Sequence, residues 1–324
     1  MAPTTTTTAR PASPTLARLL DDELAVSPTF GGRYSNHLAM ALAALDQMGA
    51  PPETLERTFR AHLRGESEPR EDGPDLAARL AEVARDGIDA VVRRRAPALS
   101  DAPGTALFHP LIRLAYGLDA GHEGQVAAAL LDWEKRRQPL PVPTGPPGAK
   151  RLADVAAALR AHPADTWPSG FDMRGVAARP ELAAAVEGLA VDERTLDDAV
   201  EFALLAHVAA GDFVTLHCVT GARALHRVSQ VLDEADARPL AAAASVAMAV
   251  AYVIAGAPPL PDRAALDHLR AGPLPAAAEV TERAIASRDP HVIKLANVAL
   301  VEEARTGDPL YRVVGARVVG LAPG

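Results

Sequence analysis

Four of the ten histidines lie in apolar stretches, and together they point to metal chemistry. His37, His109, His217 and His291 each have aliphatic or aromatic neighbours. Neutral imidazole is the commonest metal ligand and suits zinc, iron, copper and nickel. Burying polar rings without partners would cost about 1–3 kcal/mol each. A shared metal site is one interpretation, and four unrelated core histidines, each with its own partner, are the other.

The remaining histidines are weaker candidates for such a site. Four lie near charges, turns or expected helix ends and are expected to face solvent: His62, His122, His162 and His268. His226 follows His217 by nine residues, which is about 180° around a helix, so the two do not share a face. A break at Gly211-Asp212 separates His207 from His217.

Lys294 is one of three lysines in a chain whose other basic residues are arginines. It follows His291 by three positions, so both side chains lie on one helix face, and Asn297 comes three positions later. A lysine whose amine is deprotonated by burial can react with carbon dioxide, and the resulting carbamate is an anionic ligand. Arginine stays protonated and cannot do this. The other interpretation is that Lys294 pairs with a buried acid such as Glu302.

The elements that must position these residues are predicted to be helices. Alanine is abundant and aromatic residues make up only 4 % of the 324 residues, which leaves few rings to stack on a flat ligand. No convincing alternating strand pattern is present, so the expected fold is all-α, a multi-helix array with short Pro/Gly loops. The expected helices span 36–48, 74–95, 109–117, 121–137, 151–162, 192–210, 212–233, 239–255, 275–287, 289–305 and 309–319, and a further helix is expected to begin at residue 52.

The chain is expected to form one helical domain over 14–324. Residues 1–13 form a Thr/Pro/Ala tail that lacks the apolar core of a secretory signal. Residues 139–148 are too rich in proline for a helix or a central strand and are expected to form a linker. The weakly charged run at 238–259 is mostly alanine, so we expect a buried helix rather than a membrane span.

Composition and missing motifs exclude several classes of function. The net charge of −8 argues against a nucleic-acid partner. The single cysteine, Cys218, excludes an intrachain disulfide and paired-cysteine metal sites and fits a cytoplasmic setting. The dinucleotide, zinc-protease and serine-hydrolase motifs are absent. The stretch at 145–150 is faintly similar to a phosphate loop, but its prolines remove the necessary amide donors.

The four histidine blocks resemble those of the questin oxidase-like family in order and rough spacing. The blocks are 36–41, 108–113, 216–220 and 289–295, and the resemblance covers about residues 30–318. Members of this family open a ring of anthraquinone-type polyketides. One member is described as an NADPH-requiring, Baeyer–Villiger-like enzyme, and another as a non-heme iron dioxygenase with histidine ligands and a carboxylated lysine.

The resemblance implies an Fe(II) oxygenase that uses O2 to break a C–C bond in an aromatic polyketide. Its implied metal ligands are His37, His109, His217, His291 and Lys294. Arg113, four residues after His109, is a candidate anchor for substrate oxygens or else a surface charge; Tyr116 and Phe108 line the pocket or belong to the core. Three alternatives stay open: a metal-free or flavin-fed monooxygenase with NADPH as reductant, a helical zinc hydrolase, and a non-enzymatic helical binding protein.

Overall fold

The chain folds almost entirely into α-helices, which confirms the predicted all-α class. A computed structural model describes residues 12–32, 34–65, 67–141, 148–168 and 170–321. Most of the expected tail, residues 1–11, lies outside the described residues. The same holds for residues 142–147 of the expected linker.

The elements follow one another with short connections. The first half contains α1 (Pro14–Glu23), β1 (Thr29–Phe30), β2 (Tyr34–Ser35), α2 (Leu38–Gln47), α3 (Pro52–Leu63), α4 (Gly73–Asp86), α5 (Ile88–Arg95), η1 (Ala96–Leu99), α6 (His109–Ala120) and α7 (Glu123–Arg136). The second half contains α8 (Leu152–Arg160), η2 (Ala164–Thr166), α9 (Met173–Ala177), α10 (Pro180–Val186), α11 (Thr195–Ala210), α12 (Phe213–Ser229), α13 (Glu234–Ile254), α14 (Arg263–Ala271), α15 (Ala277–Ala286), α16 (Pro290–Thr306) and α17 (Leu310–Val318).

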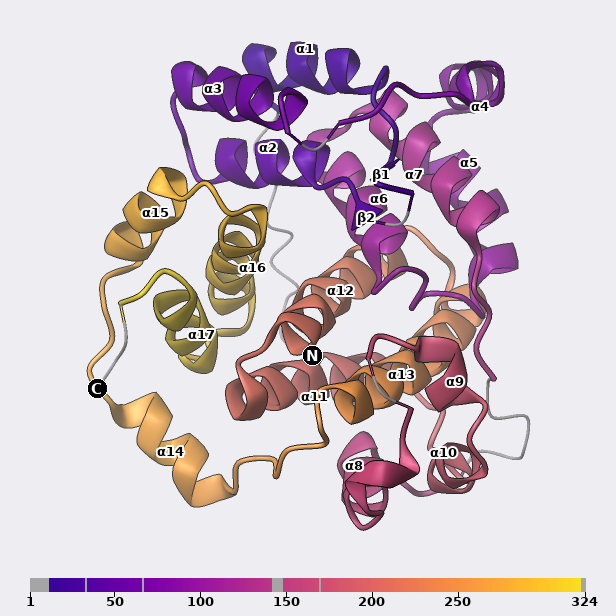
Figure 1. Cartoon of the computed structure of the whole chain (residues 1–324), viewed down its shortest axis with the longest axis vertical. Coiled ribbons are helices and arrows are strands. Elements are labelled where there is room, and N and C mark those ends of the chain that lie inside the picture. Colours follow the sequence, from indigo (N-terminus) through magenta and orange to yellow (C-terminus); the bar gives the residue numbers. More distant parts are fainter. Residues whose placement is uncertain (1–11, 33, 66, 142–147, 169, 322–324) are drawn as a thin grey trace.

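Four helices from distant parts of the chain form a closed ring of contacts. α2 packs against α6, α6 against α12, α12 against α16, and α16 returns to α2. Figure 1 shows the four helices in the upper and middle part of the view, below α1 and α3 and above α11 and α13. The pairs are close in space although hundreds of residues separate the first and last helix in sequence, so the fold gathers side chains from four segments around one interior region.

The apolar run after residue 238 forms the long helix α13, which is buried as predicted. By length and composition it is the one helix in the described part of the chain that qualifies as a membrane span, but 78 % of its apolar window is buried inside the protein. Its many alanines allow close approach by α11, α12, α8 and α9. α13 is therefore a core helix of this fold.

The local structure differs from the expectations in one predicted helix and in several elements that were not predicted. The helix predicted over 74–95 is two helices, α4 and α5, because Gly87 adopts a positive φ of 83° between them. α1, α9, α10 and α14 were not predicted. A minimal hairpin is also present, in which Thr29 of β1 lies opposite Ser35 of β2; strands of two residues carry no readable alternation.

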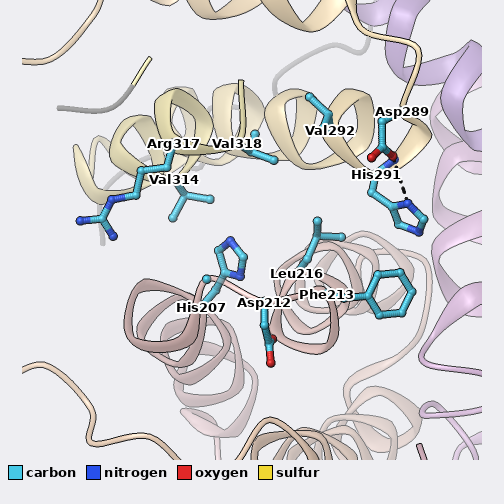
Figure 2. A pocket seen from close by; sticks show the side chains of 11 residues that line it. His207, Asp212, Phe213, Leu216, Asp289, His291, Val292, Val314, Arg317 and Val318 are labelled. Carbon is cyan, nitrogen blue, oxygen red and sulfur yellow. Dashed lines mark hydrogen bonds and ion pairs between the residues drawn. The ribbon is translucent and has the colours of Figure 1, made fainter. Parts of the chain in front are cut away.

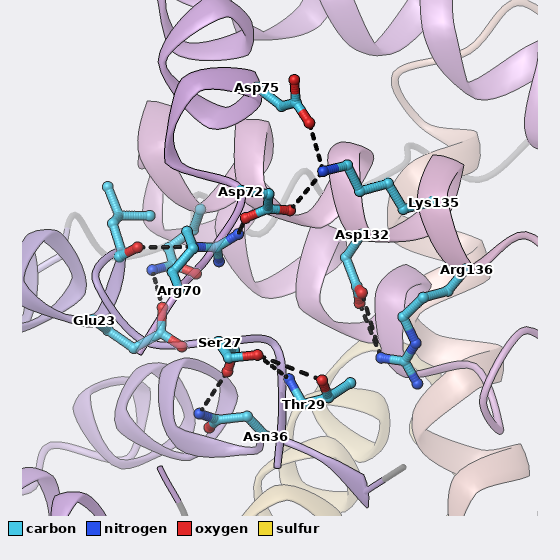
Figure 3. Close-up of polar contacts among 12 residues, drawn as sticks. Glu23, Ser27, Thr29, Asn36, Arg70, Asp72, Asp75, Asp132, Lys135 and Arg136 are labelled. Carbon is cyan, nitrogen blue, oxygen red and sulfur yellow. Dashed lines mark hydrogen bonds and ion pairs between the residues drawn. The ribbon is translucent and has the colours of Figure 1, made fainter. Parts of the chain in front are cut away.

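Polar contacts fix the segment that leads into α2. The Asn36 side chain donates to the Ser27 carbonyl at 3.1 Å and accepts from the Leu38 amide at 2.8 Å, so it holds the first turn of α2. Arg136 of α7 joins Asp132 to the Ser35 hydroxyl. Figure 3 shows Asn36, Asp132 and Arg136 in the same region as the contacts that Lys135 makes with Asp72 and Asp75. The residue that follows Asn36 is His37.

Candidate metal centre

The ring of four helices brings together the four histidines that the sequence singled out. His37 caps α2, His109 is the first residue of α6, His217 lies in the second turn of α12, and His291 is near the start of α16. Pro110 and Pro290 fit the first turns of α6 and α16, where an amide donor is not needed. Three helices therefore begin at this point.

The rings lie within reach of a common ion. The Nε2 atoms of His37 and His109 are 2.7 Å apart, and ligand atoms of His37, His217 and His291 all lie within 4.8 Å of one another. Ring centroids are 4.5–6.5 Å apart in the recorded pairs. Two nitrogens bound to one ion at about 2.1 Å cannot be more than about 4.2 Å apart. Small side-chain movements would thus satisfy a shared metal.

A second set of hydrogen bonds orients three of the four rings. The Nδ1 of His217 is 2.8 Å from the Phe213 carbonyl, and that of His291 is 3.1 Å from the Asp289 carboxylate. The Nδ1 of His109 bonds the Ala106 carbonyl. Since each Nδ1–H donates to an oxygen, each Nε2 is left as a bare acceptor. Metal-binding histidines show this arrangement.

Several buried polar atoms in this region have no hydrogen-bond partner among the described residues. They are the Nε2 atoms of His217 and His291 and the Nζ of Lys294. Buried polar groups in folded proteins are almost always paired, and an orphan group calls for an explanation such as an ion. A cation bound by the two nitrogens provides one, so this donor set fits a metal.

Lys294 is fully buried on α16 and acts on all four histidines. Burial lowers the pKa of every one of these imidazoles, and the charge of Lys294 lowers it further. Burial also lowers the pKa of Lys294 itself to about 7, against a small opposing effect of Asp289. The alternative partner, Glu302, instead bonds Arg305 at 2.6 Å. The structure therefore supplies neutral imidazoles and an amine that deprotonates readily.

A left-handed stretch of chain precedes His109. Ala106, Leu107 and Phe108 have φ values of 49°, 54° and 67°, although none is glycine. Such backbone costs about 1–2 kcal/mol per residue and tends to occur at functional sites. Phe108 is held against α12, where a Cβ added at Gly221 would lie 2.7 Å from its ring. This turn aims the Ala106 carbonyl at the His109 ring.

Two predicted catalytic residues lie in other networks. Arg113 is buried, pairs with Glu23 and donates to the Gln125 side chain at 3.0 Å, so its guanidinium links α6 to α1 and α7. The Tyr116 hydroxyl donates to Asn297 at 3.0 Å, and burial raises the pKa of Tyr116. These contacts tie helices together; a catalytic role for either residue stays a prediction.

A cavity of about 310 Å³ lies between α11, α12, α16 and α17, and His291 is the one of the four histidines that lines it. Figure 2 shows His291 and Phe213 near one end and His207 and Arg317 toward the other. Phe213 is 45 % exposed. Its ring centroid lies 4.6 Å from that of His217 and 4.9 Å from that of His291. The volume is near the lower end of the usual range for small-molecule sites, about 300–1,000 Å³.

Sequence reasoning missed three contributors to this region: Asp289, Phe213 and His207. Asp289 carried a readable signal, because an aspartate before Pro290 is a favoured helix cap and also lies close to His291. Phe213 and His207 gave none, since their positions depend on how α11 and α12 pack.

One comparison with known proteins gives a match. The family model described as Questin oxidase-like matches residues 80–299, about two thirds of the chain. The match includes three of the histidines and Lys294, whereas His37 lies before it. Curated proteins give no match.

Proposed function

Because this chain belongs to the questin oxidase-like family and is thus an oxidoreductase by descent, we propose that it is a non-heme iron oxygenase. Its substrate would be an aromatic polyketide of the anthraquinone type, and the reaction an oxidative cleavage of a ring C–C bond with O2. The observation that carries this proposal is the convergence of four imidazoles from four helices, in which the buried Nε2 atoms of His217 and His291 have no partner among the described residues.

The proposed ligands are His37, His109, His217, His291 and Lys294, with Lys294 as its carbamate. The neutral amine adds to carbon dioxide and loses one proton, which gives an anionic oxygen ligand. Two features favour an anion here: four neutral imidazoles offset no metal charge, and three helices direct their positive N-terminal ends at the site. The orphan Nζ in a fully buried position supports the same assignment.

Bound ferrous iron would supply the redox chemistry through which oxygen is used. The protein's own residues prepare the site. The Asp289 carboxylate accepts a hydrogen bond from the Nδ1–H of His291 and fixes the orientation of that ring. Phe213, exposed to the cavity and in contact with two ligand rings, offers a face on which a flat aromatic substrate stacks. These five residues would hold the ion and would leave it accessible to O2.

The decisive experiment is anaerobic reconstitution with Fe(II), followed by elemental analysis and oxygen-electrode measurements with a hydroxyanthraquinone. We expect stoichiometric iron and substrate-dependent oxygen consumption without NADPH. Oxygen consumption by metal-free protein that requires NADPH would instead support the monooxygenase alternative. Hydrolysis by a zinc-loaded sample without oxygen would support the hydrolase. We expect activity in the cytoplasm, in line with the single, buried cysteine.

A further inference from the structure

His207 faces the cavity from α11 and belongs to a short hydrogen-bond chain across the α11–α12 turn. It is 8 % exposed, and its Nδ1 lies 3.0 Å from the Thr215 hydroxyl. That hydroxyl is 2.7 Å from the Asp212 carboxylate. Figure 2 shows His207 beside Asp212, on the opposite side of Leu216 from Phe213 and His291. The Gly211-Asp212 break lets the two helices fold back on each other.

The hydrogen bonds that link His207, Thr215 and Asp212 determine which nitrogen of His207 carries the proton. A carboxylate only accepts hydrogen bonds, so the Thr215 hydroxyl donates its single proton to Asp212. The competing acceptor, the Asp212 carbonyl, is farther away at 3.3 Å. The Thr215 oxygen must then accept from the Nδ1–H of His207. The Nε2 is consequently a bare acceptor.

Nothing in the described part of the chain bonds this Nε2. Burial lowers the pKa of His207 to about 4, with a further lowering by Arg317 and an opposing effect of Asp212. The ring is therefore neutral near pH 7 and cannot hold an anion as an imidazolium would. The part of the cavity beyond the metal centre thus presents an uncharged acceptor to its contents.

We propose that His207 Nε2 accepts a hydrogen bond from a hydroxyl group of the substrate, so that the cavity selects a phenol over its ether. Thr215 and Asp212 are positioning residues that hold the acceptor tautomer. The inference rests on the proposed function, because the same cavity adjoins His291. A substrate stacked on Phe213 would direct its oxidisable ring to the metal and its hydroxyl to His207.

The test compares two matched probes, 2-naphthol and 2-methoxynaphthalene, by fluorescence titration of metal-free and iron-reconstituted protein at pH 7. Wild type should bind the naphthol about tenfold more tightly, equivalent to about 1.4 kcal/mol. His207→Phe should bind both probes equally, because it keeps a ring and removes the acceptor. His207→Gln, which retains an acceptor oxygen, should keep part of the preference and guards against loss of folding in the phenylalanine variant.

Two further variants separate hydrogen bonding from cavity shape. Thr215→Val frees the Nδ1, so the tautomer that donates from Nε2 becomes accessible; binding of the ether should then strengthen, which loss of packing would not produce. Val314→Ala is the matched control, since it lines the same cavity without a polar group; it should weaken both probes and leave their ratio unchanged.

Equal affinities in wild type, no saturable binding, or a wild-type preference in His207→Phe would overturn the inference. The proposed function fails separately, on iron content and oxygen consumption. Protein that binds no iron yet prefers the naphthol would retain the acceptor site and lose the oxygenase. Protein that binds iron and consumes oxygen without any preference would lose only the role of His207.

Discussion

Two regions of this protein bury polar side chains, and they do so in opposite ways. In the first, which we call the Glu82 cluster, Glu82 of α4 bonds Arg79, Arg94 and Arg95 at 2.8, 2.7 and 3.0 Å. Arg79 also bonds Glu134 of α7. In the second, the histidine centre, buried nitrogens of His217, His291 and Lys294 have no partner within the described structure.

The difference separates a structural use of polarity from a functional one. Each carboxylate of the Glu82 cluster finds a guanidinium, so that the network is complete within the chain. In the histidine centre the described part of the chain supplies no partner for these three nitrogens, and a bound ion is the partner that we propose. Stability alone would favour pairing or replacing such groups, because an orphan buried donor or acceptor costs about 1–3 kcal/mol. The four predictions below test this contrast.

The largest expected effect follows from removing one imidazole. His217→Ala or His291→Ala should abolish iron binding and lower oxygen consumption by at least about 100-fold, since a ligand loss should exceed the 10–100-fold typical of an outer-shell change. Elemental analysis and an oxygen electrode measure both. His226→Ala, nine residues along α12 from His217, is the control and should retain iron. Near-normal turnover in the ligand variants would assign these histidines a structural role.

The position of Lys294 should tolerate no other basic residue. Lys294→Arg is expected to be inactive, because a guanidinium cannot be carboxylated. Lys294→Ala should regain part of its activity when acetate fills the vacated position. Lys135→Arg, whose lysine bonds Asp72 and Asp75 at the surface, should behave as wild type. A tolerated arginine with no acetate rescue would be the pattern of a salt bridge and would contradict the carbamate.

A smaller effect is expected from the carboxylate behind His291. Asp289→Asn keeps the size of the side chain but makes it a weaker acceptor of the hydrogen bond from His291 Nδ1–H. Iron affinity should therefore fall by about 10–100-fold. Competition with a chelator measures the change. Glu303→Gln, on the far part of α16 where Glu303 bonds Arg312, serves as the matched control. Unchanged affinity in Asp289→Asn would mean that the ring is oriented by packing alone.

The Glu82 cluster should respond in stability and leave iron binding untouched. Burial raises the pKa of Glu82, but hydrogen bonds from Arg95 and Arg94 outweigh it and lower the pKa to about 2. Because the folded-state value lies below the unfolded one, this stabilisation is present above about pH 4.5 and is lost as the pH falls toward 2. Glu82→Gln should cost about 2 kcal/mol at pH 7 and flatten this acid limb in urea titrations. Loss of iron binding in this variant would break the contrast between the two regions.

The composition and the apolar flanks of four histidines predicted much of this molecule. Alanine content indicated the helices, and the neighbours of His37 and His217 indicated burial near one another. The break between α4 and α5 at Gly87 was not predicted, because a glycine within an amphipathic pattern is also compatible with a continuous helix. Only its positive φ in the structure shows the break. His207 was set aside for the break at Gly211-Asp212, although that break is what folds α11 back beside Thr215.

The backbone carbonyls that orient the histidine rings could not be predicted from residue types. The Ala106 and Phe213 carbonyls orient two rings, yet a carbonyl exists at every position, and only local geometry makes these two special. Arg113 shows the converse problem. Its position four residues after His109 suggested a substrate anchor. In the structure its guanidinium instead forms an ion pair with Glu23, ninety residues earlier.

The left-handed turn before His109 limits how this centre could be transplanted into another scaffold. A helix copied from His109 onward would carry the imidazole without the Ala106 carbonyl that sets its direction. Copying the turn as well would import an unfavourable backbone, whose Phe108 side chain packs closely against Gly221 of α12. A designer would have to move α6, its preceding turn and the facing strip of α12 as one indivisible part.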